Sequence, residues 1–215
     1  MVRFCLRAPA LFLAVTMAAS CASSGPSSSG TTSAPAGAAV GFRPEASLSL
    51  CPRQKVSNAP SVDGEGNVRG YKTFATVNGV RLLVNPAPGS CLSSNYGNRN
   101  GRLHKGMDFQ SQPAGPVVAA AGGTVVEAGY RDDYGTFVLI DHGRGVYTRY
   151  AHLASATSAA KEGRQVKLGS HLGIMGNTAS YRIPVHLHYE VLTGDYNTPK
   201  KSFGLTPVNL LSKMR

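Results

Sequence analysis

The sequence has no tryptophan, few acidic residues and no long hydrophobic run. Its 215 residues include 11 Asp and Glu against 22 Lys and Arg, which gives a formal charge of +11. The apolar run Ala8–Ala19 is uncharged, but it is too short to span a bilayer, because a transmembrane helix needs roughly 20 residues. The sequence therefore argues against a membrane-spanning segment at this position and indicates a strongly basic protein.

A secretory signal is predicted at the N-terminus. Arg3 and Arg7 precede the apolar run, and Ala18-Ala19-Ser20 precedes Cys21. A basic start, a short apolar core and small residues before a cleavage site are typical of export signals. The ending resembles a bacterial lipobox, although Ala18 stands where a large aliphatic residue is usual. We predict a lipoprotein-type signal peptide over residues 1–20 and a lipid on Cys21. A simple cleaved signal and a buried N-terminal helix are the alternatives.

An uncharged segment follows the signal. No charged residue occurs between Arg7 and Arg43, and residues 21–44 consist largely of Ser, Gly, Ala, Thr and Pro. Such a segment buries too little apolar surface to offset its ordering entropy, so we predict a disordered tether. The rest is divided into a small N-terminal β extension, residues 45–90, and a main domain, residues 91–215.

The positive charge indicates the kind of partner. Without Arg3 and Arg7 the formal charge falls from +11 to +9. An exported basic protein usually faces an anionic polymer or surface. Because the chain lacks tryptophan and any alternation of aromatic and basic residues, we expect no nucleic acid partner. Anionic cell-wall polymer or lipid head groups fit better, and a generally basic soluble surface is the alternative.

Four cysteines are present, and two of them are predicted to pair. Cys5 belongs to the signal and Cys21 is expected to carry lipid, which leaves Cys51 and Cys91. In an exported protein a remaining pair is best interpreted as a disulfide. A zinc-ligand role for one of them is the alternative, but neither has a second ligand type nearby in the sequence.

Short apolar stretches separated by glycine predict an all-β fold. Asn78-Gly79 lies between the runs Tyr71–Val77 and Val80–Val84, which is a hairpin signal. Helical turns are expected only near Ser155–Ala160 and Thr206–Leu211. Regular short strands with glycine turns are typical of antiparallel sandwiches and barrels. Further strands are expected at Val117–Ala120, Thr124–Ala128, Thr136–Asp141, Val146–His152, Gln165–Leu168, His171–Met175 and Val185–Leu192.

Two histidine motifs predict a metal site. His104 and Asp108 lie in a glycine-containing stretch that favours an extended turn over a helix, and His186-Leu187-His188 lies in a predicted strand. Period-two geometry puts His186 and His188 on one face of that strand. A solvent-facing polar face is the alternative. Two histidines and a carboxylate form the set that a catalytic zinc takes while keeping one position open. His152 supplies a further imidazole.

At these residues the chain resembles the lysostaphin/LytM-type zinc metallopeptidases, which cut peptide cross-bridges of bacterial peptidoglycan. The resemblance covers about Cys91 to Tyr196. Several ordered motifs carry it: Ser94-Asn95-Tyr96-Gly97-Asn98-Arg99, Leu103-His104-Lys105-Gly106-Met107-Asp108-Phe109, Thr148-Arg149-Tyr150-Ala151-His152-Leu153 and His186-Leu187-His188-Tyr189-Glu190-Val191.

The resemblance implies one zinc ion per chain, held by His104, Asp108 and His188, and a catalytic pair, His152 and His186. It implies an endopeptidase that acts on peptidoglycan peptide stems in the cell envelope. With lipid on Cys21, such an enzyme would be membrane-anchored, at the outer membrane if the cell is a diderm.

The same resemblance leaves alternatives. The stretch Ala179–Val185 differs from the Ser-Thr-Gly-Pro that the family often has before its His-Leu-His, so substrate preference and the bond cut stay open. A non-catalytic activator of other wall hydrolases and a zinc hydrolase of another secreted peptide are the competing functions. Because all five metal and catalytic positions are intact, an enzyme is favoured. His142 and His171 are expected to be structural or on the surface.

Overall fold

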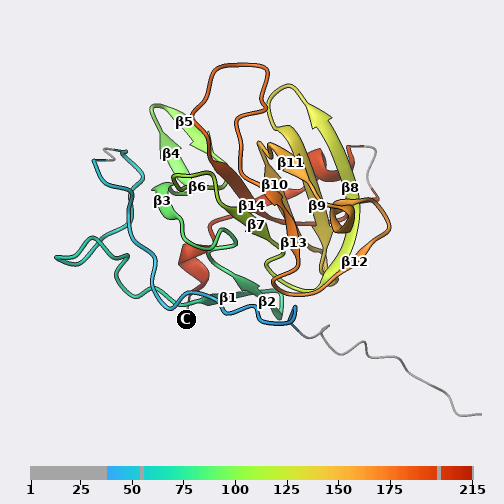
Figure 1. Cartoon of the computed structure of the whole chain (residues 1–215), viewed down its shortest axis with the longest axis horizontal. Coiled ribbons are helices and arrows are strands. Elements are labelled where there is room, and N and C mark those ends of the chain that lie inside the picture. The colour runs from blue at the N-terminus through green and yellow to red at the C-terminus, as the bar shows by residue number, and fades with distance from the viewer. Residues whose placement is uncertain (1–37, 54–55, 198–199, 215) are drawn as a thin grey trace, which may run out of the picture. The chain divides into compact units, whose positions relative to one another are not determined.

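A computed structural model describes residues 38–53, 56–197 and 200–214 (Figure 1). They belong to one compact unit, Ala34–Arg215. The predicted signal peptide, Cys21 and most of the predicted tether lie outside the described residues. Among the described residues, no helix has the length and apolar character needed to cross a membrane.

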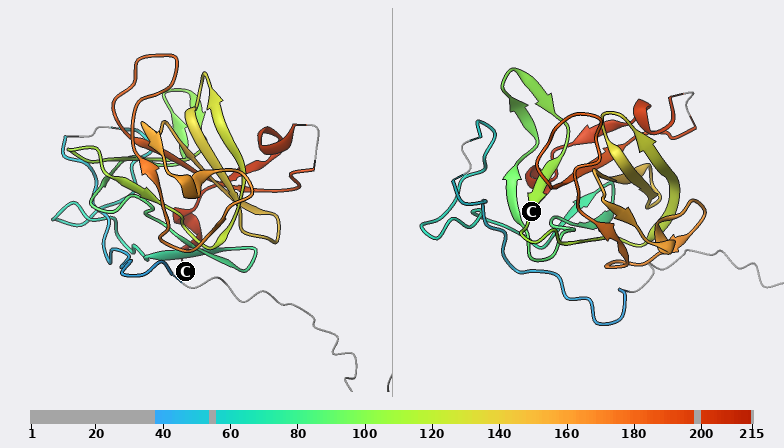
Figure 2. Two further views of the ribbon diagram at one scale, coloured as in Figure 1. Left: turned by 45° about the vertical axis from the view of Figure 1, so that its right-hand side comes forward. Right: turned by 45° about the horizontal axis from the view of Figure 1, so that its top comes forward.

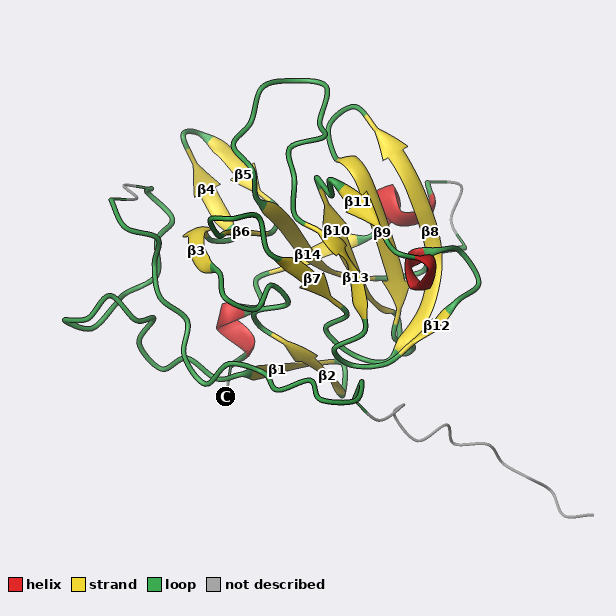
Figure 3. Cartoon of the chain, in the orientation of Figure 1, coloured by secondary structure: helices red, strands yellow, loops and turns green. Residues whose placement is uncertain are grey.

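Strands dominate the described chain, and the only helical pieces in it are short 3₁₀ turns (Figure 3). The all-β prediction is therefore confirmed. The strands are β1 (Phe74–Val77), β2 (Val80–Leu83), β3 (Cys91–Ser94), β4 (Gly97–Arg99), β5 (Arg102–His104), β6 (Met107–Gln110), β7 (Pro116–Val118), β8 (Gly123–Arg131), β9 (Gly135–Asp141), β10 (Val146–Ala151), β11 (Ser155–Ala156), β12 (Gln165–Val166), β13 (His171–Ile174), β14 (Leu187–Thr193) and β15 (Thr206–Val208). The 3₁₀ turns are η1 (Ser158–Ala160), η2 (Lys201–Gly204) and η3 (Leu211–Lys213).

The strands form one large antiparallel sheet and three small ones. The large sheet has the order β12-β8-β9-β10-β14-β6-β3, with β15 also paired to β14. A three-stranded sheet has the order β11-β13-β7, and β1-β2 and β4-β5 are separate hairpins. The central strand β14 buries Leu187, Tyr189 and Val191 in the core. The alternate side of β14 is therefore free to carry His188 and Glu190.

The hairpin of β1 and β2 confirms the turn predicted from sequence. Asn78 and Gly79 have φ values of 46° and 78°. Positive φ at both central residues is what a type I′ turn needs, and its twist matches that of the flanking strands. The strands pair from Phe74↔Leu83 to Val77↔Val80.

The N-terminal extension shares the core of the main domain. Leu48, Val68 and Leu82 are buried in the same hydrophobic cluster as Phe109 and Tyr150. Figures 1 and 2 show the blue-to-teal segment running along one side of the sheets, with the hairpin β1–β2 lying there as well. The extension thus packs on the core, while the boundary between residues 90 and 91 stays a prediction.

One expectation about helical turns is wrong. Thr206–Val208 is not helical but forms β15, which pairs with β14 from Thr193↔Thr206 to Val191↔Val208. The partner strand β6 covers only the beginning of β14, from Leu187 to Tyr189. The second half of β14 therefore offers unpaired backbone groups, and β15 satisfies them. The turn expected near Ser155–Ala160 is present only in its last three residues, as η1.

The predicted disulfide is confirmed. Cys51 and Cys91 are bonded across 40 residues of sequence, and the bond fixes the extension beside β3. In the chain-entropy account, cross-linking a loop of this length removes conformational freedom mainly from the unfolded state.

We expect Cys51→Ser/Cys91→Ser to lower the free energy of unfolding by about 4 kcal/mol, as expected for a loop of this length. Urea unfolding of the oxidised wild type and the double variant measures the difference. Dithiothreitol should destabilise only the wild type. Equal midpoints for the wild type and the double variant would contradict the expectation.

Candidate metal centre

Strand pairing brings two of the predicted ligands together. In the register of β6 and β14, Asp108 lies directly opposite His188. Side chains opposite each other in an antiparallel pair have Cβ atoms about 4.5–5.5 Å apart. His104 is the last residue of β5, and only Lys105 and Gly106 separate it from β6. The extended stretch that carries His104 and Asp108 therefore lies beside the strand that carries His188.

The three candidate ligand atoms form a small triangle. His104 Nε2 lies 3.1 Å from Asp108 Oδ1 and 3.2 Å from His188 Nδ1, and the third side, between His188 Nδ1 and Asp108 Oδ1, is 2.8 Å. Ligands of a tetrahedral zinc with bond lengths of about 2.0–2.1 Å are separated by about 3.3 Å. The triangle is slightly tighter than this, so the donor set fits a zinc ion after small movements of the side chains.

Hydrogen bonds to the outer nitrogens fix which nitrogen of each imidazole faces the centre. His104 Nδ1 donates to the carbonyl of Asn95 at 2.6 Å, and His188 Nε2 donates to Glu190 Oε1 at 3.0 Å. Because these partners are acceptors, the outer nitrogens hold the protons, which leaves His104 Nε2 and His188 Nδ1 to bind a metal. The tautomers are therefore prepared for a ligand role.

Asp108 is held at both carboxylate oxygens. Arg99 donates to Oδ2 at 2.9 Å, while Oδ1 faces the two histidines. Burial raises the pKa of Asp108, but its favourable interactions with the side chains of His104 and His188 outweigh burial and hold this pKa well below its usual range. The carboxylate is therefore charged at neutral pH, as a metal ligand must be.

The carboxylates on either side of His188 favour its protonated form. Burial lowers the pKa of His188, but hydrogen bonds to Asp108 and Glu190 overcome this effect and raise the pKa to about 9. A metal ion that binds here would take the place of a proton between these groups, because ligands must be deprotonated.

A close backbone approach shapes the link between His104 and Asp108. A Cβ on Gly106 would collide with the carbonyl oxygen of Tyr189 and contact Glu190 Cγ at 3.0 Å. The short link thus crosses directly over β14, which only glycine permits at this position. The glycine between His104 and Asp108 is therefore required because a larger residue would collide with β14.

A buried polar network supports His188 from behind. Glu190, which is 1% exposed, accepts bonds from His188 Nε2, from the Tyr134 hydroxyl at 2.9 Å and from Arg149 at 2.6 Å. Arg149 is 2% exposed, and its guanidinium lies 4.5 Å from the ring centre of Tyr134. The guanidinium and Tyr134 hold the Glu190 carboxylate charged and oriented toward His188.

His186 and His152, the predicted catalytic pair, lie together beside the triangle. Their ring centres are 4.7 Å apart, and His186 Nε2 is 3.7 Å from Asp108 Oδ1. His186 Nδ1 donates to the carbonyl of Pro184 at 2.8 Å, so Nε2 carries the lone pair that faces the centre. Burial lowers the pKa of His186 and, to about 3, that of His152.

The backbone at His152 is unusual. Its φ is 65°, in the left-handed region that residues other than glycine rarely adopt, and its backbone amide donates to the carbonyl of Tyr134 at 2.8 Å. His152 Nδ1 is buried and has no hydrogen-bond partner among the described residues. Such strain is held where the surrounding structure over-determines it, often at functional sites.

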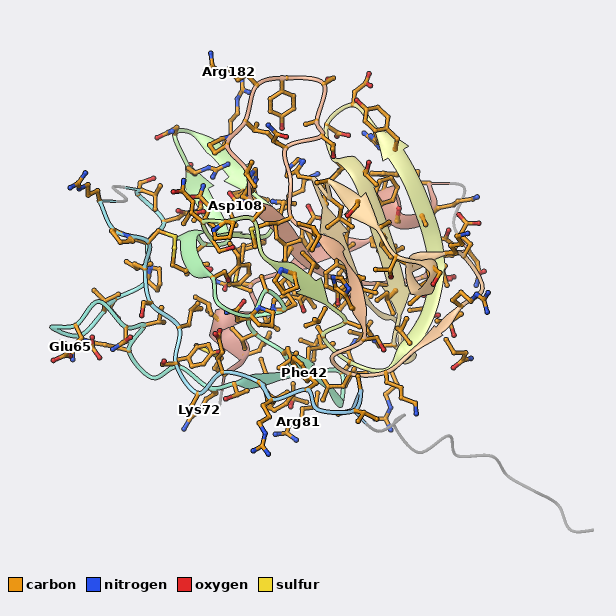
Figure 4. All side chains as sticks on the ribbon, in the orientation of Figure 1. Phe42, Glu65, Lys72, Arg81, Asp108 and Arg182 are labelled. Carbon is orange, nitrogen blue, oxygen red and sulfur yellow. A yellow bond between two sulfur atoms is a disulfide. The ribbon has the colours of Figure 1, made fainter. Side chains whose placement is uncertain are left out.

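The centre lies in a cleft of about 1010 Å³. Figure 4 shows Asp108 among the strands and Arg182 on a loop that projects beyond them. That loop belongs to the stretch Ala179–Val185, and Tyr181, Ile183 and Pro184 line the cleft. The stretch that differs from the family pattern therefore borders the cleft.

The other two histidines lie away from the triangle. His142 is half-buried and bonds to the carbonyl of Gly122 at 2.8 Å and the hydroxyl of Thr148 at 2.7 Å. His171 is exposed and bonds to the carbonyl of Gly173 at 2.8 Å. These positions agree with the expected structural and surface roles.

Sequence reasoning gave no role to several residues that hold the centre. Arg99, Arg149 and Glu190 occur in the sequence motifs without a predicted role, and Tyr134 occurs in none of the motifs named above. One signal was available for Glu190, because period-two alternation places it on the face of His188. No such signal links Tyr134 or Arg149 to Glu190, since these contacts depend on the tertiary fold.

Comparisons with known proteins identify the family of this domain. Residues 102–199 match the model of Peptidase family M23. Residues 102–199 therefore match an M23 peptidase domain, which confirms the resemblance found from the motifs. M23 is a family of zinc-dependent metallopeptidases, and all five predicted metal and catalytic residues lie inside the matched range.

Relatives match only this domain. The lipoprotein NlpD/LppB homolog of Pseudomonas aeruginosa is 42% identical over 93 residues, which is 43% of this chain and 30% of that protein. The peptidoglycan DD-endopeptidase ShyA of Vibrio cholerae is 37% identical over 89 residues, covering 41% of this chain and 20% of that protein. The match thus spans less than a third of each of these relatives.

A solved structure shares the fold of the domain. The crystal structure of Csd3 from Helicobacter pylori is similar over 62% of this chain and 33% of that chain, with 28% identity and a TM-score of 0.50.

We expect Gly106→Ala to destabilise the protein by about 1–3 kcal/mol, because the carbonyl of Tyr189 belongs to the central strand and cannot retreat. Thermal unfolding measures the loss. Gly129→Ala is the matched control, since a Cβ at Gly129 meets nothing within 4 Å. An equal effect of the two substitutions would contradict the steric account.

Removal of Arg149 should destabilise the protein, because the Glu190 carboxylate would remain buried without its cation. We expect Arg149→Met to lower the free energy of unfolding by about 3 kcal/mol, because it leaves a buried charge without its cation. In the double variant with Glu190→Gln the loss should be smaller than the sum of the two single losses. Urea unfolding of all four proteins tests this, and simple additivity would show that the pair is not coupled.

Proposed function

We propose that the chain is a zinc-dependent endopeptidase that hydrolyses peptide cross-links of bacterial peptidoglycan. One observation carries the proposal: three ligand atoms converge in a cleft, and their outer hydrogen bonds leave the correct nitrogens free for a metal. His104, Asp108 and His188 would hold the zinc ion. The family match and the name of the Vibrio cholerae relative support the choice of substrate.

The mechanism follows from the positions of the protein groups. Zinc supplies Lewis-acid chemistry, which polarises a carbonyl and makes water a stronger acid. His186 directs the lone pair of Nε2 toward the centre, so it can accept a proton from the attacking water. His152 lies against His186 and can stabilise charge on the reacting carbonyl or pass a proton to the leaving amine.

The proposed setting is the cell envelope. The predicted lipoprotein-type signal and Cys21 would anchor the enzyme through lipid, and residues 21–44 would connect it to the membrane. The Pseudomonas aeruginosa relative, which is named a lipoprotein homolog, agrees with this setting.

The test is digestion of purified peptidoglycan, with the released fragments separated and weighed by mass spectrometry. We expect the wild type to release cross-link fragments whose masses identify the bond that is cut. His188→Ala should lose more than about 100-fold in rate, because even groups that only support a metal ligand contribute about 10–100-fold.

A matched control uses a histidine outside the centre. His171→Ala changes an exposed residue and should retain wild-type activity. If the wild type binds zinc but releases no fragments, the enzyme proposal fails. The competing role, activation of another wall hydrolase, would then predict faster digestion when a partner hydrolase is added.

A further inference from the structure

A segment that precedes the family match reaches the metal centre. We call residues 48–53 and 56–59 the arm. Leu50 pairs with Leu92 in a parallel bridge, the amide of Cys51 donates to the carbonyl of Leu92 at 2.9 Å, and the amide of Leu92 donates to the carbonyl of Ser49 at 2.8 Å. The arm therefore extends the large sheet beyond β3, and the disulfide to Cys91 fixes it there.

Beyond the disulfide the arm lies against the loop that follows β3. In Figure 1 and in the right-hand view of Figure 2, the cyan segment runs beside β3 and β4. Val56 lines the cleft of the metal centre. The hydroxyl of Ser57 donates to the carbonyl of Asn98 across a long 3.5 Å. The last part of the arm is thus a neighbour of the centre.

Asn58 contacts the end of β3 and the loop that follows it with both ends of its carboxamide. Nδ2 donates to the carbonyl of Asn95, and Oδ1 accepts from the hydroxyl of Ser94 at 3.2 Å. The Cβ of Asn58 also lies 4.0 Å from the place where a Cβ on Gly97 would stand. Asn58 therefore connects the arm to Ser94, the last residue of β3, and to Asn95, the residue that follows it.

The carbonyl that Asn58 holds is the one that orients His104. The oxygen of Asn95 accepts from Asn58 Nδ2 and from His104 Nδ1, the latter at 2.6 Å. The side chain of Asn95 does not help to fix this loop, because its buried Oδ1 has no partner among the described residues. The hold on the carbonyl thus comes from outside the loop, and Asn58 provides it.

We propose that Asn58 is a positioning residue for the zinc site. By fixing the carbonyl of Asn95, it keeps the proton of His104 on Nδ1 and directs Nε2 toward the metal. This inference rests on the proposed function, since it concerns the affinity of the proposed zinc site. It extends the site to a residue that lies 44 positions before the matched range of 102–199.

The test measures the zinc dissociation constant of the whole protein by competition with a chelating dye. We expect Asn58→Asp to weaken zinc binding by about 10-fold or more, in the range found for groups that support a metal ligand. The substitution keeps the size of the side chain but replaces the donor by an oxygen that repels the Asn95 carbonyl. Asn58→Ala should weaken binding to a similar degree.

Ser57→Ala is the matched control, because Ser57 lies on the same arm but bonds to the carbonyl of Asn98 and not to the carbonyl of Asn95 that accepts from His104. We expect its zinc affinity to stay within about twofold of the wild type, well below the 10–100-fold range for groups that orient a ligand. The visible spectrum of the cobalt-substituted protein should change in both Asn58 variants and stay unchanged in Ser57→Ala. Urea unfolding of the metal-free proteins shows that the variants are folded.

The outcomes separate the two proposals. Wild-type zinc affinity in Asn58→Asp, or equal weakening in Ser57→Ala, would overturn the role of Asn58 while leaving the zinc site intact. A wild-type protein that takes up no zinc would overturn the proposed function and this inference together.

Discussion

The antiparallel pairing of β6 with β14 is the constraint on which the centre depends. Its register sets Asp108 opposite His188 and places Leu187 and Tyr189 on the core side of the sheet. A shift by one residue would turn His188 into the core and expose Tyr189, because side chains alternate along a strand. The burial of Leu187 and Tyr189 therefore fixes the strand register that places Asp108 opposite His188.

Around this pairing, each proposed ligand is oriented by a group behind it. Arg99 holds Asp108, the Asn95 carbonyl holds His104, and Glu190 holds His188. Such outer contacts select the tautomer of a histidine and increase its basicity. The arrangement leaves one ligand atom of each side chain directed at the centre. The three residues are therefore buried and still able to bind a metal.

The cost of this arrangement is a charged network in the protein interior. Glu190 and Arg149 are almost fully buried, and such pairs are tolerated only when hydrogen bonds satisfy the remaining polar atoms. Tyr134, His188 and the carbonyl of Ser202 complete most of these bonds. The segment around η2 therefore contributes to the centre, although it lies beyond the strands that carry the ligands.

The sequence by itself determined the all-β class, the turn at Asn78-Gly79, the disulfide partners and the five candidate residues of the centre. The fold class, the turn and the disulfide follow from local alternation, glycine positions and residue chemistry, which act over a few residues, whereas the set of five residues is what the resemblance of the motifs implies. Only the tertiary structure decided that Thr206–Val208 is a strand, that Tyr134 and Arg149 hold Glu190, and that Asn58 reaches the Asn95 carbonyl. These features depend on unpaired strand edges and on contacts between distant segments, and no local pattern in the sequence encodes either of them.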